Sequence, residues 1–392
     1  MKLEGLFGEA VDRIGGEPIS ARMARKAPIR HLDPTLLLTT LLLAAFGAVM
    51  VFSTTLHDLR ALGADDSLFL KRQVAYAVVG VVALGIVAFF DYRHLRGLSP
   101  LIYGFTLIML LLVLTPLGEV RQGASRWINL GAFQAQPSEL AKIAVVVALA
   151  AFLAERKGEV GAGHVAVCCA IVAVPSFLIY LEPDLGTMVV LLSGLGALLL
   201  AGGAKVRHFL IIGVLGALAV FVVIQAGMLK DYQKQRLTAF LDPTPDPRSY
   251  GYNLTQSKIA IASGGMRGKG IEGENTQTSL GFVPEQHTDF IFTAVGEQLG
   301  FIGAATLLSL FAFLIWRALR IAAMARDLFG TLIAATIAAL WAVQLFVNVG
   351  MTMGIMPITG IPLPFISYGG SSLITNFIAV GLLMNVHMRR FL

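Results

Sequence analysis

The stretch 290-FIFTAVGEQLGFIGAATLLSLFAFLIW-316 decides the fold, and Glu297 is its only charged residue. It is longer than the roughly 20 residues that a helix needs to cross the hydrocarbon of a bilayer. The helix of a small soluble core is shorter and carries a polar face. We therefore expect a transmembrane helix over 290–316.

Similar apolar runs recur along the chain. We expect further spans at 34–54, 69–90, 98–117, 138–154, 163–181, 186–203, 208–228, 328–351 and 365–387. The composition agrees, because 56% of the 392 residues are hydrophobic and 14% are charged, whereas soluble domains have about 25% charged residues. The sequence predicts an all-α integral membrane protein with about ten transmembrane helices in a single membrane domain, 32–392.

The placement of basic residues predicts the orientation. Lys and Arg lie in the N-terminal segment, in alternate short connections and at the C-terminus: Arg30, Arg93, Arg96, Arg156, Lys157, Lys205, Arg207, Arg317, Arg320, Arg326, Arg389 and Arg390. The positive-inside rule then puts both termini in the cytoplasm, with residues 1–31 as a cytoplasmic tail. The net charge of +6 follows from this orientation and does not indicate a nucleic-acid partner.

The connections without such clusters are predicted to face the outside: 55–68, 118–137, 182–185, 229–289 and 352–364. The large extracytoplasmic loop 229–289 separates the seventh and eighth helices and is long enough to be functional. Its stretch 263-SGGMRGKG-270 offers glycine amide N–H groups beside Arg267 and Lys269. Such a stretch suits a phosphate or pyrophosphate, or it is a flexible turn with solvated charges.

Asp289 begins the eighth span, close to Glu285 and His287. A carboxylate at this position can cap the helix N-terminus. It can also serve as a general base, because partial burial raises the pKa of a carboxyl group. Spacing alone favours the cap, which is the commonest role of such an aspartate.

Two further places carry candidate residues. Glu139 and Lys142 are three residues apart and share one helix face, so they form an internal ion pair or contact a substrate. Trp127 lies where aromatic residues anchor proteins at the membrane interface, and it could also contact a bound lipid.

Several blocks, in this order, resemble the SEDS family (shape, elongation, division and sporulation) of bacterial peptidoglycan polymerases. The blocks are 124-ASRWINLG-131, 136-QPSELAK-142, 182-EPDLGT-187, 256-QSKIA-260, 263-SGG-265, 284-PEQHTDFIF-292, 297-EQLGFIG-303 and 360-GIPLPFISYGGSS-372. The residues at 268–270 and 276–278 resemble the elongation branch, RodA, more than the division branch, FtsW. Gln298 departs from the pattern, since an acidic residue is usual there.

The resemblance implies a glycosyltransferase of the bacterial cytoplasmic membrane that polymerises lipid II on the outer face, with Asp289 as catalytic residue. It adds Lys258 and Ser367, which lie in matched blocks, to the candidate substrate-binding residues Trp127, Glu139, Lys142, Arg267, Lys269, Glu285 and His287. It further implies a class B penicillin-binding transpeptidase and other elongation-complex proteins as partners. A divalent cation, Mg²⁺ or Mn²⁺, is implied without its ligands, and no organic cofactor is expected.

The expected chemistry is a single inverting displacement. Asp289 would accept the proton of the acceptor hydroxyl, while Arg267, Lys269, Lys142 or a metal neutralises the departing pyrophosphate. A lipid II flippase, an FtsW-like division polymerase and a non-catalytic scaffold are the competing hypotheses. The chain shows no internal repeat of the kind that many transporters have.

Overall fold

The computed structural model describes residues 31–121, 124–129, 131, 134–156, 160–227, 234, 236, 240, 250–271, 273, 276–283 and 285–391. The predicted cytoplasmic tail, apart from residue 31, and most of 228–249 in the predicted outer loop lie outside the described residues.

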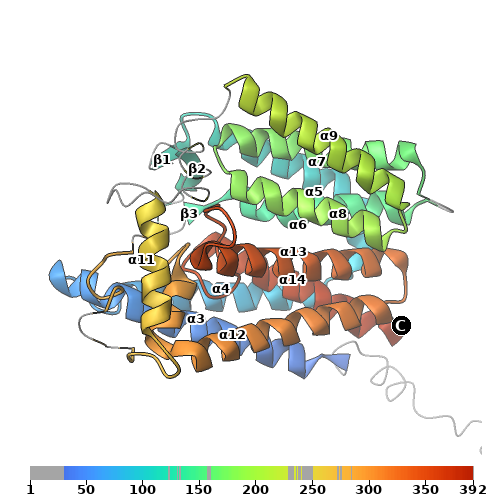
Figure 1. Cartoon of the computed structure of the whole chain (residues 1–392). Coiled ribbons are helices and arrows are strands. Elements are labelled where there is room, and N and C mark those ends of the chain that lie inside the picture. Colours follow the sequence, from blue (N-terminus) through green and yellow to red (C-terminus); the bar gives the residue numbers. More distant parts are fainter. Residues whose placement is uncertain are drawn as a thin grey trace, which may run out of the picture.

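Long apolar helices packed side by side form most of the structure (Figure 1). They are α3 (Pro34–Ala61), α4 (Leu68–Phe89), α5 (Tyr92–Val113), α6 (Pro137–Ala154), α7 (Ala162–Leu181), α8 (Leu185–Ala201), α9 (Val206–Gln225), α12 (Ile291–Met324), α13 (Leu328–Met353) and α14 (Gly370–Met388). Among the described residues, nine of these helices are long and apolar enough to cross a membrane, and α8, with 17 residues, is apolar but shorter. The prediction of a helical, multi-pass membrane protein is confirmed.

Local capping explains where the observed ends differ from the predicted ones. The third span starts at Tyr92 instead of residue 98, because the Asp91 carboxylate accepts a hydrogen bond from the Arg93 amide and begins the helix there. The last span starts at Gly370 instead of residue 365, because 363–367 forms a turn in which the Ser367 amide donates to the Leu363 carbonyl at 3.0 Å.

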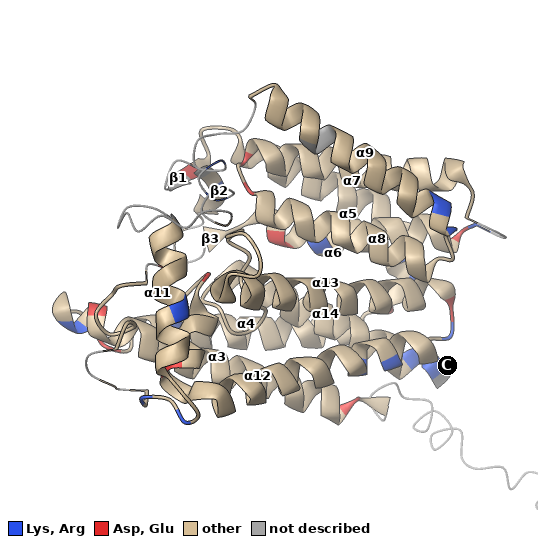
Figure 2. Ribbon diagram, viewed as in Figure 1, with Lys and Arg blue, Asp and Glu red and all other residues tan. Residues whose placement is uncertain are grey.

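Polar side chains join the helices at the end of the bundle where the chain finishes. Asp33 caps α3, is buried, and pairs with Arg317 of α12. Tyr92 donates a hydrogen bond of 2.9 Å to Asp327, which caps α13. Figure 2 shows that the charged residues of the described chain lie mostly at the two ends of the bundle, as expected for a protein that spans a bilayer.

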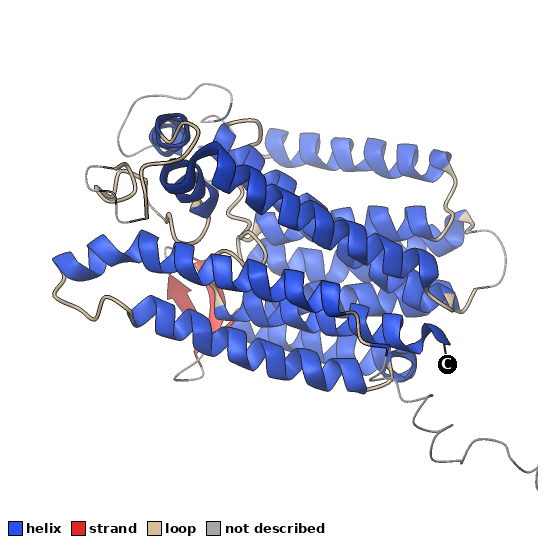
Figure 3. Ribbon diagram, turned by 90° about the horizontal axis from the view of Figure 1, so that it is seen from below, coloured by secondary structure: helices blue, strands red, loops and turns tan. Residues whose placement is uncertain are grey.

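The opposite end carries a sheet and a further helix. Strands β1 (Gly118–Arg121), β2 (Ala124–Asn129) and β3 (Gln134–Ala135) form an antiparallel sheet in the order β1-β2-β3, and α11 (Tyr250–Ser263) lies nearby. The strands lie beside this end of the bundle in a second view (Figure 3). The all-α prediction did not include this sheet, because strands this short carry little periodicity.

Helix α12 is broken at Gly300, whose φ of 64° is left-handed. The segment 264–270 fills the break with backbone hydrogen bonds on both sides. The amides of Lys269 and Gly270 donate to the carbonyls of Glu297 and Gln298, at 3.0 and 2.9 Å. On the far side, the amides of Phe301 and Ile302 donate to the carbonyls of Gly265 and Met266, at 2.8 and 3.1 Å.

This close backbone contact predicts the effect of a matched pair of substitutions. Gly265 and Gly268 both have positive φ, 54° and 77°, but a Cβ at Gly268 would clash with the Gln298 carbonyl whereas one at Gly265 would meet nothing within 4 Å. Gly265→Ala should therefore cost only the backbone strain of a left-handed residue, about 1–2 kcal/mol. Gly268→Ala should lower the melting temperature in detergent considerably more, and equal melting temperatures for the two variants would contradict the packing described.

Candidate functional site

Asp289 lies immediately before α12, partly buried, at the end of the bundle that carries the sheet. Its carbonyl accepts a hydrogen bond of 2.9 Å from Asn348 Nδ2 of α13, and the same amide group donates to the Ile361 carbonyl at 2.8 Å. The N-cap of α12 is Phe290, and no side chain caps that helix. The capping alternative for Asp289 is therefore wrong, and its carboxylate is not committed to the helix end.

The Asp289 carboxylate faces Gly360 and Arg236. A Cβ at Gly360, whose φ is 73°, would lie 3.2 Å from Asp289 Oδ2 and 3.5 Å from Arg236 Nη1. Arg236 Nη1 also donates a hydrogen bond of 3.2 Å to the Thr359 carbonyl. A side chain at position 360 would therefore crowd the carboxylate of Asp289 and contact the guanidinium of Arg236.

Burial and charge set the ionisation of Asp289. Burial raises its pKa from 3.8 to about 6, the Arg236 guanidinium opposes this shift, and the Glu285 carboxylate adds to it. The carboxylate is therefore mostly ionised at pH 7 but can take up a proton easily. These are the properties of a general base.

The connection between α7 and α8 approaches the same site. A Cβ at Gly186 would lie 2.9 Å from the Thr359 carbonyl, so the start of α8 packs directly against the segment beside Asp289. Asp184 caps α8 by accepting hydrogen bonds from the amide and hydroxyl of Thr187 at 3.1 and 2.8 Å. Arg126 of β2 donates to the carbonyls of Glu182 and Pro183, which links the sheet to this connection.

Glu182 is fully buried, and neither of its carboxyl oxygens has a hydrogen-bond partner in the part of the chain that the structure describes. Burial raises its pKa to about 8, the Asp184 carboxylate adds to this, and the Arg126 guanidinium opposes it. Glu182 is therefore mostly protonated and neutral at pH 7, and the charges of Arg126 and Asp184 act on both Glu182 and Asp289.

Three predicted residues surround the turn that carries Asp289. Ser367 Oγ donates to the Thr288 carbonyl at 2.6 Å and accepts from the Leu363 amide at 2.9 Å. The His287 carbonyl accepts a hydrogen bond from the Tyr368 amide. Burial lowers the pKa of the His287 ring, which favours its neutral form. Glu285 is exposed, and its carbonyl accepts hydrogen bonds from the amides of Thr288 and Phe290, which closes the turn.

The remaining candidates make no hydrogen bond or ion pair with Asp289 within the described chain. Glu139 and Lys142 pair with each other at 2.8 Å, both buried in α6. Lys258 Nζ lies over Gly354, the C-cap of α13, where a cation is favourable. Trp127 of β2 lies opposite Glu119 of β1.

The glycine-rich stretch differs from its prediction. The expectation of free amide groups is wrong for Gly264, Gly265, Gly268, Lys269 and Gly270, whose N–H groups all donate to carbonyls of the chain itself. The Lys269 ammonium is also engaged, at 3.0 Å from the Glu297 carboxylate, while Arg267 is exposed. The stretch packs against α12, and we find no phosphate cradle in its backbone.

Sequence reasoning missed several residues of the site. Arg236 is one basic residue among several in the predicted loop, and nothing in its local sequence marks it as a neighbour of Asp289. Gly360 and Glu182 were visible only as parts of matched blocks. Asn348 links α13 to this site through hydrogen bonds to residues distant in the sequence, and local sequence does not predict such contacts.

Two further observations concern ligands. Within the described residues, no group of three or more His, Cys, Asp or Glu side chains could hold a metal ion. An apolar groove of about 400 Å³ opens between α4, α5, α6 and α14, and its lining includes Pro137, Leu140, Ile143, Phe105 and Leu382. Such a groove suits an aliphatic chain.

Comparison with known proteins gives consistent matches. A family model described as "Cell cycle protein" (FtsW, RodA and SpoVE) matches residues 34–391. The peptidoglycan glycosyltransferase MrdB of Escherichia coli K12 is 39% identical over 92% of this chain and 94% of its own. Stage V sporulation protein E of Bacillus subtilis is 39% identical over 90% and 96%. A probable FtsW glycosyltransferase of Geobacter metallireducens is 38% identical over 92% and 96%.

Solved structures give the same result. A chain from a peptidoglycan synthase complex, studied for the coordination of polymerization and crosslinking, matches with a TM-score of 0.77 and 31% identity over 92% of this chain and 98% of its own. The rod shape determining protein RodA of Thermus thermophilus matches with a TM-score of 0.68 and 29% identity, over 92% and 98%.

Proposed function

The chain belongs to the FtsW/RodA/SpoVE family, in which several relatives are named peptidoglycan glycosyltransferases, and we propose that it polymerises lipid II during cell-wall elongation. The chain is a multi-pass membrane glycosyltransferase. The observation that carries the proposal is the half-buried Asp289 carboxylate, which does not cap α12 and faces Arg236 across Gly360.

In the proposed reaction, the acceptor lipid II attacks with its GlcNAc 4-hydroxyl oxygen. A bond forms from this oxygen to the anomeric carbon of the growing strand, and the bond from that carbon to the undecaprenyl pyrophosphate breaks. The configuration inverts from α to β, which a single displacement with one general base accomplishes. Asp289 takes the hydroxyl proton, and its raised pKa suits this task.

The departing pyrophosphate needs positive charge close to the displaced oxygen. Arg236 is the best-placed cation, because its guanidinium lies across Gly360 from Asp289. Lys269 is a weaker candidate than the sequence suggested, since it is paired with Glu297, and Lys142 is paired with Glu139. The apolar groove beside α6 would accommodate part of the undecaprenyl chain.

A divalent cation, Mg²⁺ or Mn²⁺, remains part of the proposal only as an ion that protein carboxylates and substrate phosphates would bind together. The described residues offer no cage of three acidic or imidazole side chains, so they do not fit a metal held by protein alone. Mg²⁺ commonly binds through one or two carboxylates and the phosphates of a substrate. No step above passes through it.

We place the chain in the bacterial cytoplasmic membrane with both termini inside and Asp289 outside. The alternation of basic connections supports this orientation. A class B penicillin-binding transpeptidase is the proposed partner, alongside other proteins of the elongation complex. The similarity to a chain from a synthase complex that coordinates polymerization and crosslinking supports such a partner.

The competing hypothesis of a lipid II flippase fits the observations less well. Transporters bind their substrates near the middle of the membrane, at the interface of repeated halves. Here the acidic and basic residues of the candidate site gather at one end of the bundle, around the start of α12.

We predict that Asp289→Asn abolishes glycan formation from purified lipid II in detergent, because an amide cannot accept the hydroxyl proton. Wild-type protein should form polymer in the same micelles, where there is no membrane to transport lipid across. Asp66→Asn, which removes an exposed carboxylate paired with Arg60, is the control and should keep wild-type activity. Polymer from Asp289→Asn at the wild-type rate would remove Asp289 as the base.

The assignment to the elongation branch predicts a specific cellular phenotype. Expressed in cells depleted of their own RodA, the chain should restore rod shape, and in cells depleted of FtsW it should not restore septation. Both outcomes are scored by microscopy with expression verified by immunoblot. Rescue of septation alone would assign the chain to the division branch.

A further inference from the structure

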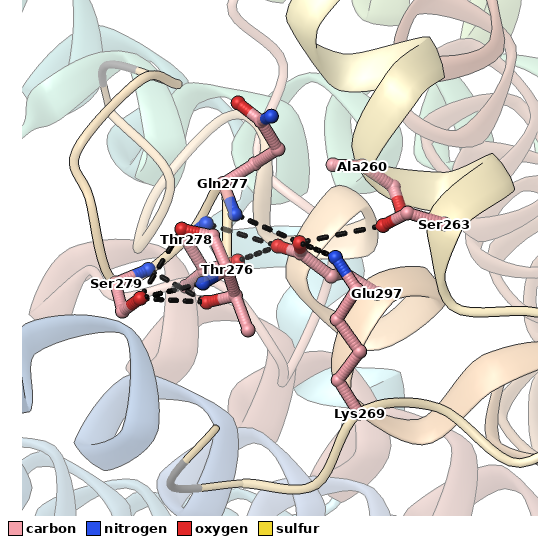
Figure 4. A network of polar contacts seen from close by, with 8 residues as sticks. All are labelled: Ala260, Ser263, Lys269, Thr276, Gln277, Thr278, Ser279 and Glu297. Atoms are coloured by element: carbon pink, nitrogen blue, oxygen red, sulfur yellow. Dashed lines mark hydrogen bonds and ion pairs between the residues drawn. The ribbon is translucent and has the colours of Figure 1, made fainter. Parts of the chain in front are cut away.

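Glu297 is a fully buried carboxylate within α12, two turns beyond Asp289. Its two oxygens accept hydrogen bonds from the amides of Gln277 and Thr278 at 2.8 and 2.9 Å, and from the Thr278 hydroxyl at 2.7 Å. Lys269 Nζ lies at 3.0 Å and Ser263 Oγ at 3.5 Å. Figure 4 shows these donors arriving from the loop and from α11 to converge on this single side chain.

The turn that Glu297 holds, 276–279, is itself closed. The amide of Thr276 donates to Ser279 Oγ, and the amide of Ser279 donates to Thr276 Oγ1, both at 2.9 Å. The Leu280 amide donates to the Thr276 carbonyl at 3.0 Å. A displacement of Glu297 therefore moves the turn as one unit.

Gln286 connects this turn to the one that carries Asp289. Its Nε2 donates to the Thr278 carbonyl at 2.9 Å and to the Thr54 carbonyl of α3 at 3.2 Å. Gln286 is buried and belongs to 285–290, which is closed by the bond from the Phe290 amide to the Glu285 carbonyl at 3.2 Å. A continuous series of contacts thus runs from Glu297 through Thr278 and Gln286 to the turn of Asp289.

A carboxylate is required at position 297 for this arrangement. A buried ion is costly unless it is paired and fully hydrogen-bonded, and here three of its donors, the amides of Gln277 and Thr278 and the Thr278 hydroxyl, belong to the 276–279 turn. A glutamine would keep the size of the side chain, but its NH₂ group would face donors and repel them. The cost of burying the charge is thus offset only when the turn is in place.

We propose that Glu297 is a positioning residue, whose carboxylate fixes the 276–279 turn and, through Gln286, holds Asp289 in its productive position. The proposal rests on the proposed function, because it concerns the same reaction. A displacement of about 1 Å at a reacting group can cost roughly 10²-fold in rate. The effect should therefore appear in turnover and much less in substrate binding.

The test compares three variants in the detergent polymerisation assay, with kcat and KM measured separately. Glu297→Gln and Gln286→Met should each lower kcat by at least roughly tenfold and leave KM within about twofold. Asp33→Asn is the matched control: it neutralises another buried carboxylate that accepts backbone amides and pairs with Arg317, at the opposite end of the bundle. It should lower the melting temperature but keep kcat.

The double variant Glu297→Gln/Gln286→Met separates positioning from general stability. If the two residues act in one series of contacts, the double variant should be about as slow as the slower single variant. The proposal would be overturned if the kcat losses of the two single variants multiply in the double variant. Equal kcat losses for Glu297→Gln and Asp33→Asn would also overturn it. Should Glu297→Gln fail to fold, Gln286→Met decides alone, and wild-type kcat in that variant overturns the proposal.

Failure of the positioning role is distinguishable from failure of the proposed function. Active Glu297→Gln together with inactive Asp289→Asn would reject only the positioning role. Active Asp289→Asn would reject the catalytic assignment itself.

Discussion

The carboxylate of Glu297, buried inside a helix long and apolar enough to span a membrane, is the constraint on which the end of the bundle carrying Asp289 depends. Lipid cannot solvate a charge, so the chain must supply every donor itself. It does so with the amides of Gln277 and Thr278, the Thr278 hydroxyl and Lys269, and Lys269 lies in the segment that inserts into the break of α12 at Gly300. This insertion requires glycine at positions 264, 268 and 300, because a Cβ at each would clash with the backbone of the opposing segment. A stretch that could be a flexible turn is thereby held in one place.

The fixed arrangement at this end of the bundle also makes Asp289 suitable as a base. Asn348 of α13 holds its backbone, Ser367 and Gln286 hold the residues before it, and Gly360 allows the backbone to approach its carboxylate closely. Burial raises its pKa more strongly than Arg236 and Arg126 lower it, which yields a base that is ionised at neutral pH and still basic. Glu182, on which the charges of Arg126 and Asp184 also act, is mostly neutral at pH 7. Environment, and not residue type, distinguishes the roles of these carboxyl groups.

The sequence predicted what depends on local composition and little of what depends on distant contacts. Apolar run length and charge placement were sufficient for the helical, multi-pass fold, since each helix satisfies its own backbone. They could not predict the break at Gly300 or the engaged amides of 264–270, because these result from pairing between segments some thirty residues apart. Asp289 was singled out from the resemblance, whereas spacing alone favoured a helix cap that the structure excludes. Arg236 and Asn348 came to light only when the fold brought them beside Asp289.

The central claim is that burial tunes Asp289 to act as the general base. The pH dependence of kcat/KM for lipid II polymerisation reports the ionisation of the free enzyme and tests this claim most directly. A carboxylate acts as a base only when deprotonated, so kcat/KM should fall tenfold per pH unit on the acid side of a midpoint near 6, matching the pKa of about 6 for Asp289. A profile that stays flat down to pH 5, or one with its midpoint near 4, the usual value for an exposed carboxyl group, would contradict the account.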